Sequence, residues 1–189
     1  MDVNDKFHSF MKSFCAAVEL QSRAAQQGCF LECVVLTAAI IDATLRIGLI
    51  LKHQIETSSS NLLEDILCQG EQDKAFSERK IYKNSFGKGI IDEQTFNELN
   101  DLYGERNKVV HRYIISSITT LDMLRIAEQY DDLKHKVSNF VAVLEKEQIR
   151  LGVGMTVNGN GENLDKDINE LARSKHGDDG LASALRECL

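Results

Sequence analysis

The chain has 189 residues, a net charge of −7, and neither proline nor tryptophan. Its hydrophobic content of 43% is too high for wholesale disorder, and its acidic balance argues against a protein that coats nucleic acid with its whole surface. Because proline is the strongest helix breaker, its absence favours long helices over short strands.

Two long helices are predicted in the N-terminal part. Apolar residues spaced three and four apart predict a first helix over residues 3–27, and Gly28 can end it. A second helix, over residues 30–55, is apolar on nearly all sides. A helix of this kind has no solvent face, so we expect it at the centre of the core.

The second helix also passes a length test for a membrane span. The nineteen residues from Cys33 to Leu51 are mostly apolar, but Asp42 and Arg46 lie four apart in their middle. Each charge there would cost about 2.5–3.5 kcal/mol on insertion. We therefore expect a buried helix with an Asp42–Arg46 ion pair, and no membrane partner.

The first ten residues and the cysteines bear on the compartment. "MDVNDKFHSF" lacks the pattern of a secretory signal, and the cysteines are odd in number and scattered, which favours a reducing cytoplasm. No Cys-x-x-Cys pair occurs, and no histidine lies at zinc-ligand spacing beside a cysteine pair. We expect neither a metal nor a cofactor, and expect Cys29 and Cys33 to be small apolar packing residues.

The middle of the chain carries weaker signals. Asn61, followed three residues later by an acid, predicts a short helix over 62–69 that Gly70 closes. Residues 71–91 are predicted to hold one or two helical turns and a flexible connection at 87–89. Asp92 can cap the next helix, whose apolar stripe comprises Phe96, Leu99, Leu102 and Tyr103.

Gly104 is expected to interrupt or bend that helix. A last long amphipathic helix is predicted over 120–150. The sequence therefore predicts an all-α bundle of four to five helices over residues 1–151. Residues 152–189 are predicted to form a glycine- and asparagine-rich linker and a short helical tail, whose role the sequence leaves open.

Residues 105–113, "ERNKVVHRY", hold the main functional signal. Arg106 and His111 combine a guanidinium, which grips phosphate, with an imidazole, which moves protons near neutral pH. The spacing alone is weak evidence, because Arg46 and His53 form a similar pair in the apolar second helix.

The setting of Arg106 is more specific. Asn107 follows the arginine directly, and the stretch ends in His111-Arg112-Tyr113. This pattern resembles the Arg-x4-6-His signature of the HEPN superfamily (higher eukaryote and prokaryote nucleotide-binding domains). The His-x-Tyr ending resembles the HEPN toxins that are paired with minimal nucleotidyltransferase antitoxins. The resemblance covers about residues 1–150.

The resemblance implies an up-and-down bundle and a metal-independent endoribonuclease that cleaves RNA through the 2′-hydroxyl, as a toxin or phage-defence effector. It implies a composite active site at a homodimer interface, with Arg106 and His111 as catalytic residues. It also implies a nucleotidyltransferase antitoxin as a partner and Tyr113 as an AMP acceptor. The alternative is a non-catalytic HEPN scaffold that binds a nucleotide or a protein.

The chemistry of cleavage also favours a dimer. One proton must leave the 2′-hydroxyl and another must reach the leaving oxygen, whereas one chain offers a single histidine in this stretch. Two copies of His111 would supply both. Arg106 can stabilise charge on the phosphoryl oxygens, and Asn107 can cap a helix or bind phosphate. Lys108 and Arg112 add a local positive field for RNA.

Residues five apart on one straight helix point about 140° away from each other. Two arrangements would still bring Arg106 and His111 into one site. Either Gly104 ends the helix and Asn107 caps a new one, or residues from two chains converge.

Structural alternatives stay open for each of these residues. Arg106 can pair with a nearby carboxylate such as Asp101, His111 can be a surface or core histidine, and Tyr113 can be a core tyrosine. Lys108 and Arg112 equally suit a solvated face.

Two further regions bear on RNA binding. Asp42 is an acid that can orient Arg106 from behind. The basic stretch 78–88 includes two aromatic residues and suits RNA stacking, although a solvated loop is the simpler account.

Overall fold

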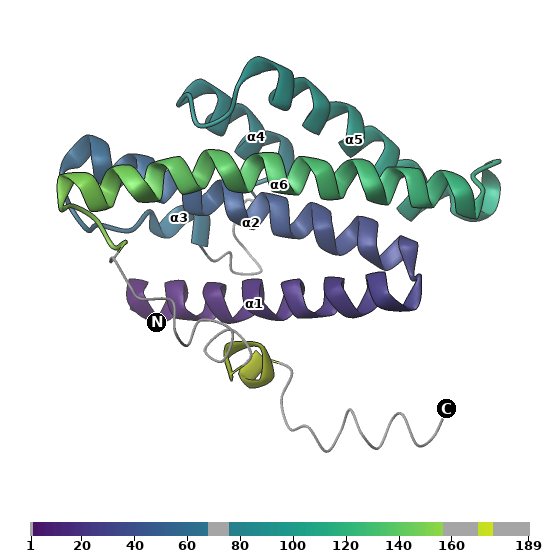
Figure 1. Cartoon of the computed structure of the whole chain (residues 1–189), viewed down its shortest axis with the longest axis horizontal. Helices are drawn as coiled ribbons and strands as arrows, with labels where there is room; N and C mark the ends of the chain where they lie inside the picture. The colour runs from purple at the N-terminus through teal and green to yellow at the C-terminus, as the bar shows by residue number, and fades with distance from the viewer. Residues whose placement is uncertain (1, 68–75, 157–169, 176–189) are drawn as a thin grey trace.

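The computed structural model describes residues 2–67, 76–156 and 170–175 (Figure 1). Within these ranges the chain forms the α-helices α1 to α6, one 3-10 turn, a further helical stretch at residues 170–175 and no strand, which confirms the all-α prediction. The elements are α1 (Val3–Gln27), α2 (Phe30–Thr57), α3 (Glu64–Leu67), α4 (Glu78–Gly87), α5 (Glu93–Arg112), the 3-10 turn η1 (Tyr113–Ile115) and α6 (Thr120–Leu151).

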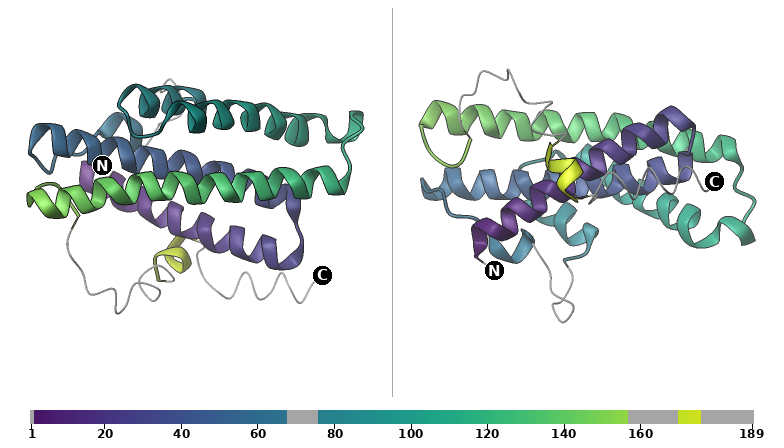
Figure 2. Two further views of the ribbon diagram at one scale, coloured as in Figure 1. Left: turned by 45° about the horizontal axis from the view of Figure 1, so that its top comes forward. Right: turned by 90° about the horizontal axis from the view of Figure 1, so that it is seen from below.

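Four long helices make the bundle, and the short α3 and α4 bring the number of α-helices above the predicted four to five. Helices α1 and α5 run in one direction and α2 and α6 in the other (Figures 1 and 2). Helix α2 lies at the centre and contacts α1, α4, α5 and α6. By length and composition α2 could cross a membrane, but 61% of its most apolar window is buried inside the bundle.

The ends of the long helices follow the sequence closely. Gly28 ends α1 in the left-handed conformation, with a φ of 70°, as its place after the apolar stripe predicts. The Asp92 carboxylate accepts a hydrogen bond of 2.7 Å from the Thr95 amide at the start of α5. A reciprocal capping box between Thr119 and Asp122 opens α6.

The middle of the chain differs from its prediction. Helix α3 begins at Glu64 rather than at residue 62, and its predicted end at Gly70 lies outside the described residues. The predicted connection at 87–89 is partly helical, because α4 runs through Gly87.

The chain after α6 starts as part of the bundle. Gln54 and Gln148 are fully buried and share a hydrogen bond of 2.8 Å. The Gln148 side-chain oxygen accepts hydrogen bonds from the amide and the hydroxyl of Thr156, which fixes residues 152–156 against α2 and α6. The predicted linker therefore begins as an ordered segment.

Only one part of the remaining tail is described. Residues 170–175 are helical, and Ala172 is buried with Cys15 and Ala16 of α1. The other residues predicted as linker and tail lie outside the described ranges.

Candidate functional site

Helix α5 carries five of the six predicted site residues, and Tyr113 begins the turn that follows it. The helix is continuous from Glu93 to Arg112, so Gly104 does not interrupt it. Of the two arrangements that could unite Arg106 and His111, the one in which Asn107 caps a new helix is therefore wrong. Glycine in a helix costs about 1 kcal/mol relative to alanine, which burial of Leu102 and Val109 in the core outweighs.

Arg106 points from α5 towards α4. Its Nη2 donates a hydrogen bond of 2.7 Å to the Glu78 carboxylate, and its guanidinium carbon lies 5.1 Å from the centre of the Tyr103 ring. The side chain is 19% exposed, and its Nε–H is buried without a hydrogen-bond partner in the described part of the chain. The partner of Arg106 is thus Glu78 rather than Asp101.

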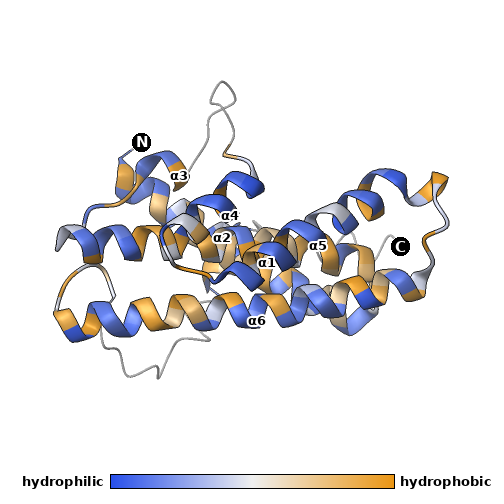
Figure 3. Ribbon diagram, turned by 90° about the horizontal axis from the view of Figure 1, so that it is seen from above, coloured by the Kyte–Doolittle hydropathy of each residue, from blue (hydrophilic) through white to orange (hydrophobic). Residues whose placement is uncertain are grey.

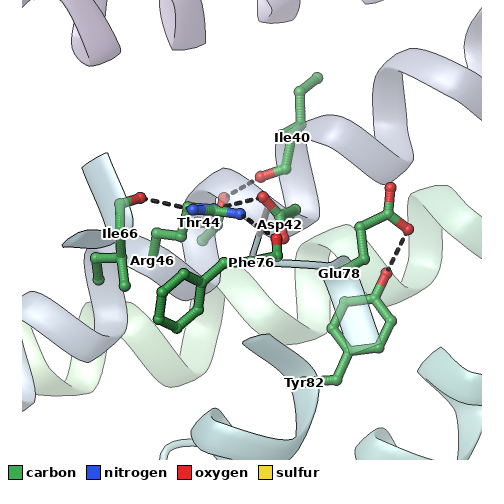
Figure 4. A network of polar contacts seen from close by, with 8 residues as sticks. All are labelled: Ile40, Asp42, Thr44, Arg46, Ile66, Phe76, Glu78 and Tyr82. Carbon is green, nitrogen blue, oxygen red and sulfur yellow. Dashed lines mark hydrogen bonds and ion pairs between the residues drawn. The ribbon is translucent and has the colours of Figure 1, made fainter. Parts of the chain in front are cut away.

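Glu78 is a site residue that the sequence did not single out. Burial raises the pKa of its carboxyl above the usual value, although the charge of Arg106 opposes this effect. The Tyr82 hydroxyl donates a hydrogen bond of 3.4 Å to the same carboxylate (Figure 4). In the sequence, Glu78 was marked only by its place in the stretch of charged and aromatic residues 78–88, which was interpreted as a solvated loop or an RNA-binding loop. Residues 78–87 of that stretch form α4 in the structure.

Asp42 and Arg46 form the predicted ion pair beside this cluster, at 2.6 Å (Figure 4). Arg46 also donates hydrogen bonds to the backbone oxygens of Ile66 (2.6 Å) and Phe76 (3.1 Å), so it joins α2 to the chain on both sides of residues 68–75. Burial raises the pKa of Asp42, while Arg46 and, more weakly, Arg106 oppose this. No hydrogen bond joins Asp42 to Arg106, so its influence on Arg106 is electrostatic.

His111 occupies a different face of α5. The side chain is exposed, and no hydrogen bond or ion pair joins it to Arg106 or to any other described residue. On a continuous helix the two side chains point about 140° apart. A single chain therefore does not assemble Arg106 and His111 into one site.

The remaining predicted residues lie at the end of α5. Asn107 is half-buried, and Lys108 pairs with Glu105 at 2.6 Å. Arg112 is exposed. Tyr113 is 43% exposed, so it is not a core tyrosine.

No group of three or more metal-ligating side chains occurs within residues 2–67, 76–156 and 170–175. The geometry instead offers a partly buried arginine, a carboxylate that orients it, and an exposed histidine. Comparison with known proteins adds no assignment. No family model, curated protein or solved structure matches the chain.

Proposed function

We propose that the protein is a metal-independent endoribonuclease of the HEPN type, acting as a homodimer in a toxin or phage-defence role in the cytoplasm. The observation that carries the proposal is the separation of two reactive groups on one rigid helix. Arg106 is oriented by Glu78, and His111 faces solvent without a partner among the described residues of its own chain. One chain therefore carries an incomplete catalytic site, which a second copy of the helix would complete.

The proposed reaction needs only side chains. One His111 imidazole removes the proton of the RNA 2′-hydroxyl, whose oxygen attacks phosphorus and closes a 2′,3′-cyclic phosphate. The bond between phosphorus and the 5′-oxygen breaks, and the His111 of the second copy, as imidazolium, donates a proton to that oxygen. Arg106 stabilises the negative charge that grows on the non-bridging oxygens.

The surface around His111 supports pairing of two chains at this end. Ile114 is 94% exposed and Ile115 is 82% exposed at the apolar turn between α5 and α6 (Figure 3). Val110 near the end of α5 and Leu121 near the start of α6 are also exposed apolar residues. Gly104 leaves open space on α5, because an added Cβ would meet nothing within 4 Å. Exposed apolar surface of this kind is stabilised when another subunit covers it.

The test measures cleavage of purified RNA in the presence of EDTA. His111→Ala and Arg106→Ala should both abolish cleavage, whereas His53→Ala, in the second arginine–histidine pair of the sequence, should leave it intact. Circular dichroism and light scattering verify that fold and assembly are unchanged. Full cleavage by both site variants would refute the proposal.

A second candidate is a non-catalytic HEPN scaffold that a nucleotidyltransferase modifies. The observation that favours it is the exposure of Tyr113 next to His111 and Arg112, where its hydroxyl is accessible to an enzyme. Intact-mass measurement after co-expression with a minimal nucleotidyltransferase should show one added AMP, and Tyr113→Phe should remove it. An unmodified wild-type chain would exclude this candidate.

A further inference from the structure

An open groove of about 630 Å³ lies between the end of α5, the turn η1 and the first turns of α6. Lys108 and Arg112 line one side of it, and Arg125 of α6 lines the other. The backbone between the helices adds Ser116 and Ser117 to its wall. We call this the arginine groove.

The arginines of this groove differ from the other arginines of the six α-helices. Arg112 and Arg125 are exposed, and neither makes a hydrogen bond or ion pair with another described residue. Each of the others has an oxygen partner on a side chain: Arg23 with Glu19, Arg46 with Asp42, Arg79 with Asn100, Arg106 with Glu78 and Arg150 with Glu147. The two unpaired guanidiniums therefore come from different helices and line the same groove.

The acids of the groove are already engaged. Glu105 pairs with Lys108 at 2.6 Å. Asp122 accepts hydrogen bonds from the Thr119 amide (2.9 Å) and hydroxyl (2.7 Å), and these bonds lower the pKa of its carboxyl, with a smaller contribution from the charge of Arg125. Neither acid forms an ion pair with Arg112 or Arg125, so the groove is open to an external anion.

Phosphate suits this arrangement. A guanidinium binds phosphate oxygens through two parallel N–H donors, and serine hydroxyls supply further donors. The same cleft between α5 and α6 becomes acidic farther along, in a section of about 680 Å³. Asp101 and Asp132 line it, together with Glu98, which pairs with the section's single cation Lys136. A polyanion would therefore be held at the η1 end and repelled from the acidic section, which confines it to the end of α5 that carries His111.

We propose that the arginine groove holds the phosphodiester backbone of the RNA strand that reaches His111, with Arg112 and Arg125 as its anchors. This inference rests on the proposed ribonuclease function and adds to it a path for the substrate. Arg112 follows His111 directly in α5, so the inference places the bound strand at the end of the helix that carries this imidazole.

Binding is tested with the full chain and a fluorescein-labelled 2′-O-methyl oligoribonucleotide, which lacks the hydroxyl needed for cleavage. Fluorescence anisotropy measures the affinity at several salt concentrations. The Arg112→Gln/Arg125→Gln double variant should bind at least about tenfold more weakly, and the slope of log K against log salt should flatten by about 1.4, as expected for two lost phosphate contacts.

The matched control is Arg23→Gln/Arg150→Gln, which removes the same charge from two exposed arginines that already have partners. It should bind like the wild type. Equal weakening by both double variants would overturn the proposal, since binding would then follow net charge alone. Competition by poly-glutamate as effective as that by unlabelled oligonucleotide would also overturn it, because the groove would then be a general carboxylate site.

The same assay separates this inference from the proposed function. His111→Ala should bind the oligonucleotide normally while failing to cleave RNA. Cleavage by His111→Ala would refute the ribonuclease mechanism, whatever the groove does. Unchanged binding by Arg112→Gln/Arg125→Gln would refute the groove, whatever His111 does.

Discussion

Substitutions of Glu78 and Arg106 should have strongly coupled effects on the free energy of unfolding, because the two side chains form an ion pair. The Arg106 side chain is only 19% exposed in the wild type, and its Nε–H has no partner among the described residues, so Glu78→Ala leaves a largely buried charge without its carboxylate. Removing one partner of a fully buried pair costs about 3–5 kcal/mol, and the remaining exposure of both side chains reduces our expectation to about 2 kcal/mol. Arg106→Ala should cost a similar amount, because Glu78 then keeps only the Tyr82 hydroxyl.

The double variant should lose less than the sum of the two single losses, with a coupling free energy of about 1–2 kcal/mol. Urea unfolding followed by circular dichroism measures all four proteins. The matched control is the Glu105–Lys108 pair, whose side chains are 42% and 54% exposed and whose coupling should stay below about 0.5 kcal/mol. Additive losses for Glu78 and Arg106, to within about 0.5 kcal/mol, would refute the view that Glu78 orients Arg106.

Three further predictions concern pH, the chain after α6 and assembly. Because burial raises the pKa of Glu78, the folded protein retains a proton that the unfolded chain releases. The wild type should therefore lose stability relative to Glu78→Gln as the pH rises above the ordinary carboxyl pKa of 4.5. Urea unfolding at several pH values measures this difference, and a gain in the relative stability of the wild type would contradict it. Gly154→Ala should lower the free energy of unfolding by about 2 kcal/mol, because Gly154 has a φ of 78° and the added Cβ would collide with the Gln148 side-chain amide. Gly152→Ala has a φ of 63° but open space around the added Cβ, so it should lower the free energy of unfolding by only about 1 kcal/mol in the same assay. Ile114→Glu/Ile115→Glu should give a monomer by light scattering that is still helical by circular dichroism. Val143→Glu, also at an exposed apolar position, should leave the dimer intact, and a dimer in both cases would place the interface elsewhere.

The long helices were predictable because their signals are local. The apolar stripe of α1 and the glycine after it indicate both ends of that helix, and Asp92 caps α5 as predicted. Helix α2 was recognisable as the core helix from its composition, and the Asp42–Arg46 pair from its i, i+4 spacing. These inferences do not require knowledge of the tertiary contacts between helices.

The candidate site was less predictable because its contacts are distant in sequence. Glu78 and Arg106 are 28 residues apart and meet only because α4 packs beside α5. The unpaired state of Arg112 and Arg125 likewise depends on which acids reach them in three dimensions. Gly104 misled the prediction, because local propensity for a break is smaller than the free energy gained by packing the residues around it.

The central claim is that the site needs His111 from two chains, and subunit mixing tests it directly. Wild type and His111→Ala are co-refolded at different ratios, and EDTA-resistant RNA cleavage is measured at constant total protein. If both histidines of a dimer are required, activity follows the square of the wild-type fraction, so an equal mixture retains about one quarter of it. Activity of about one half, linear in the wild-type fraction, would mean that each chain cleaves alone and would contradict the composite site.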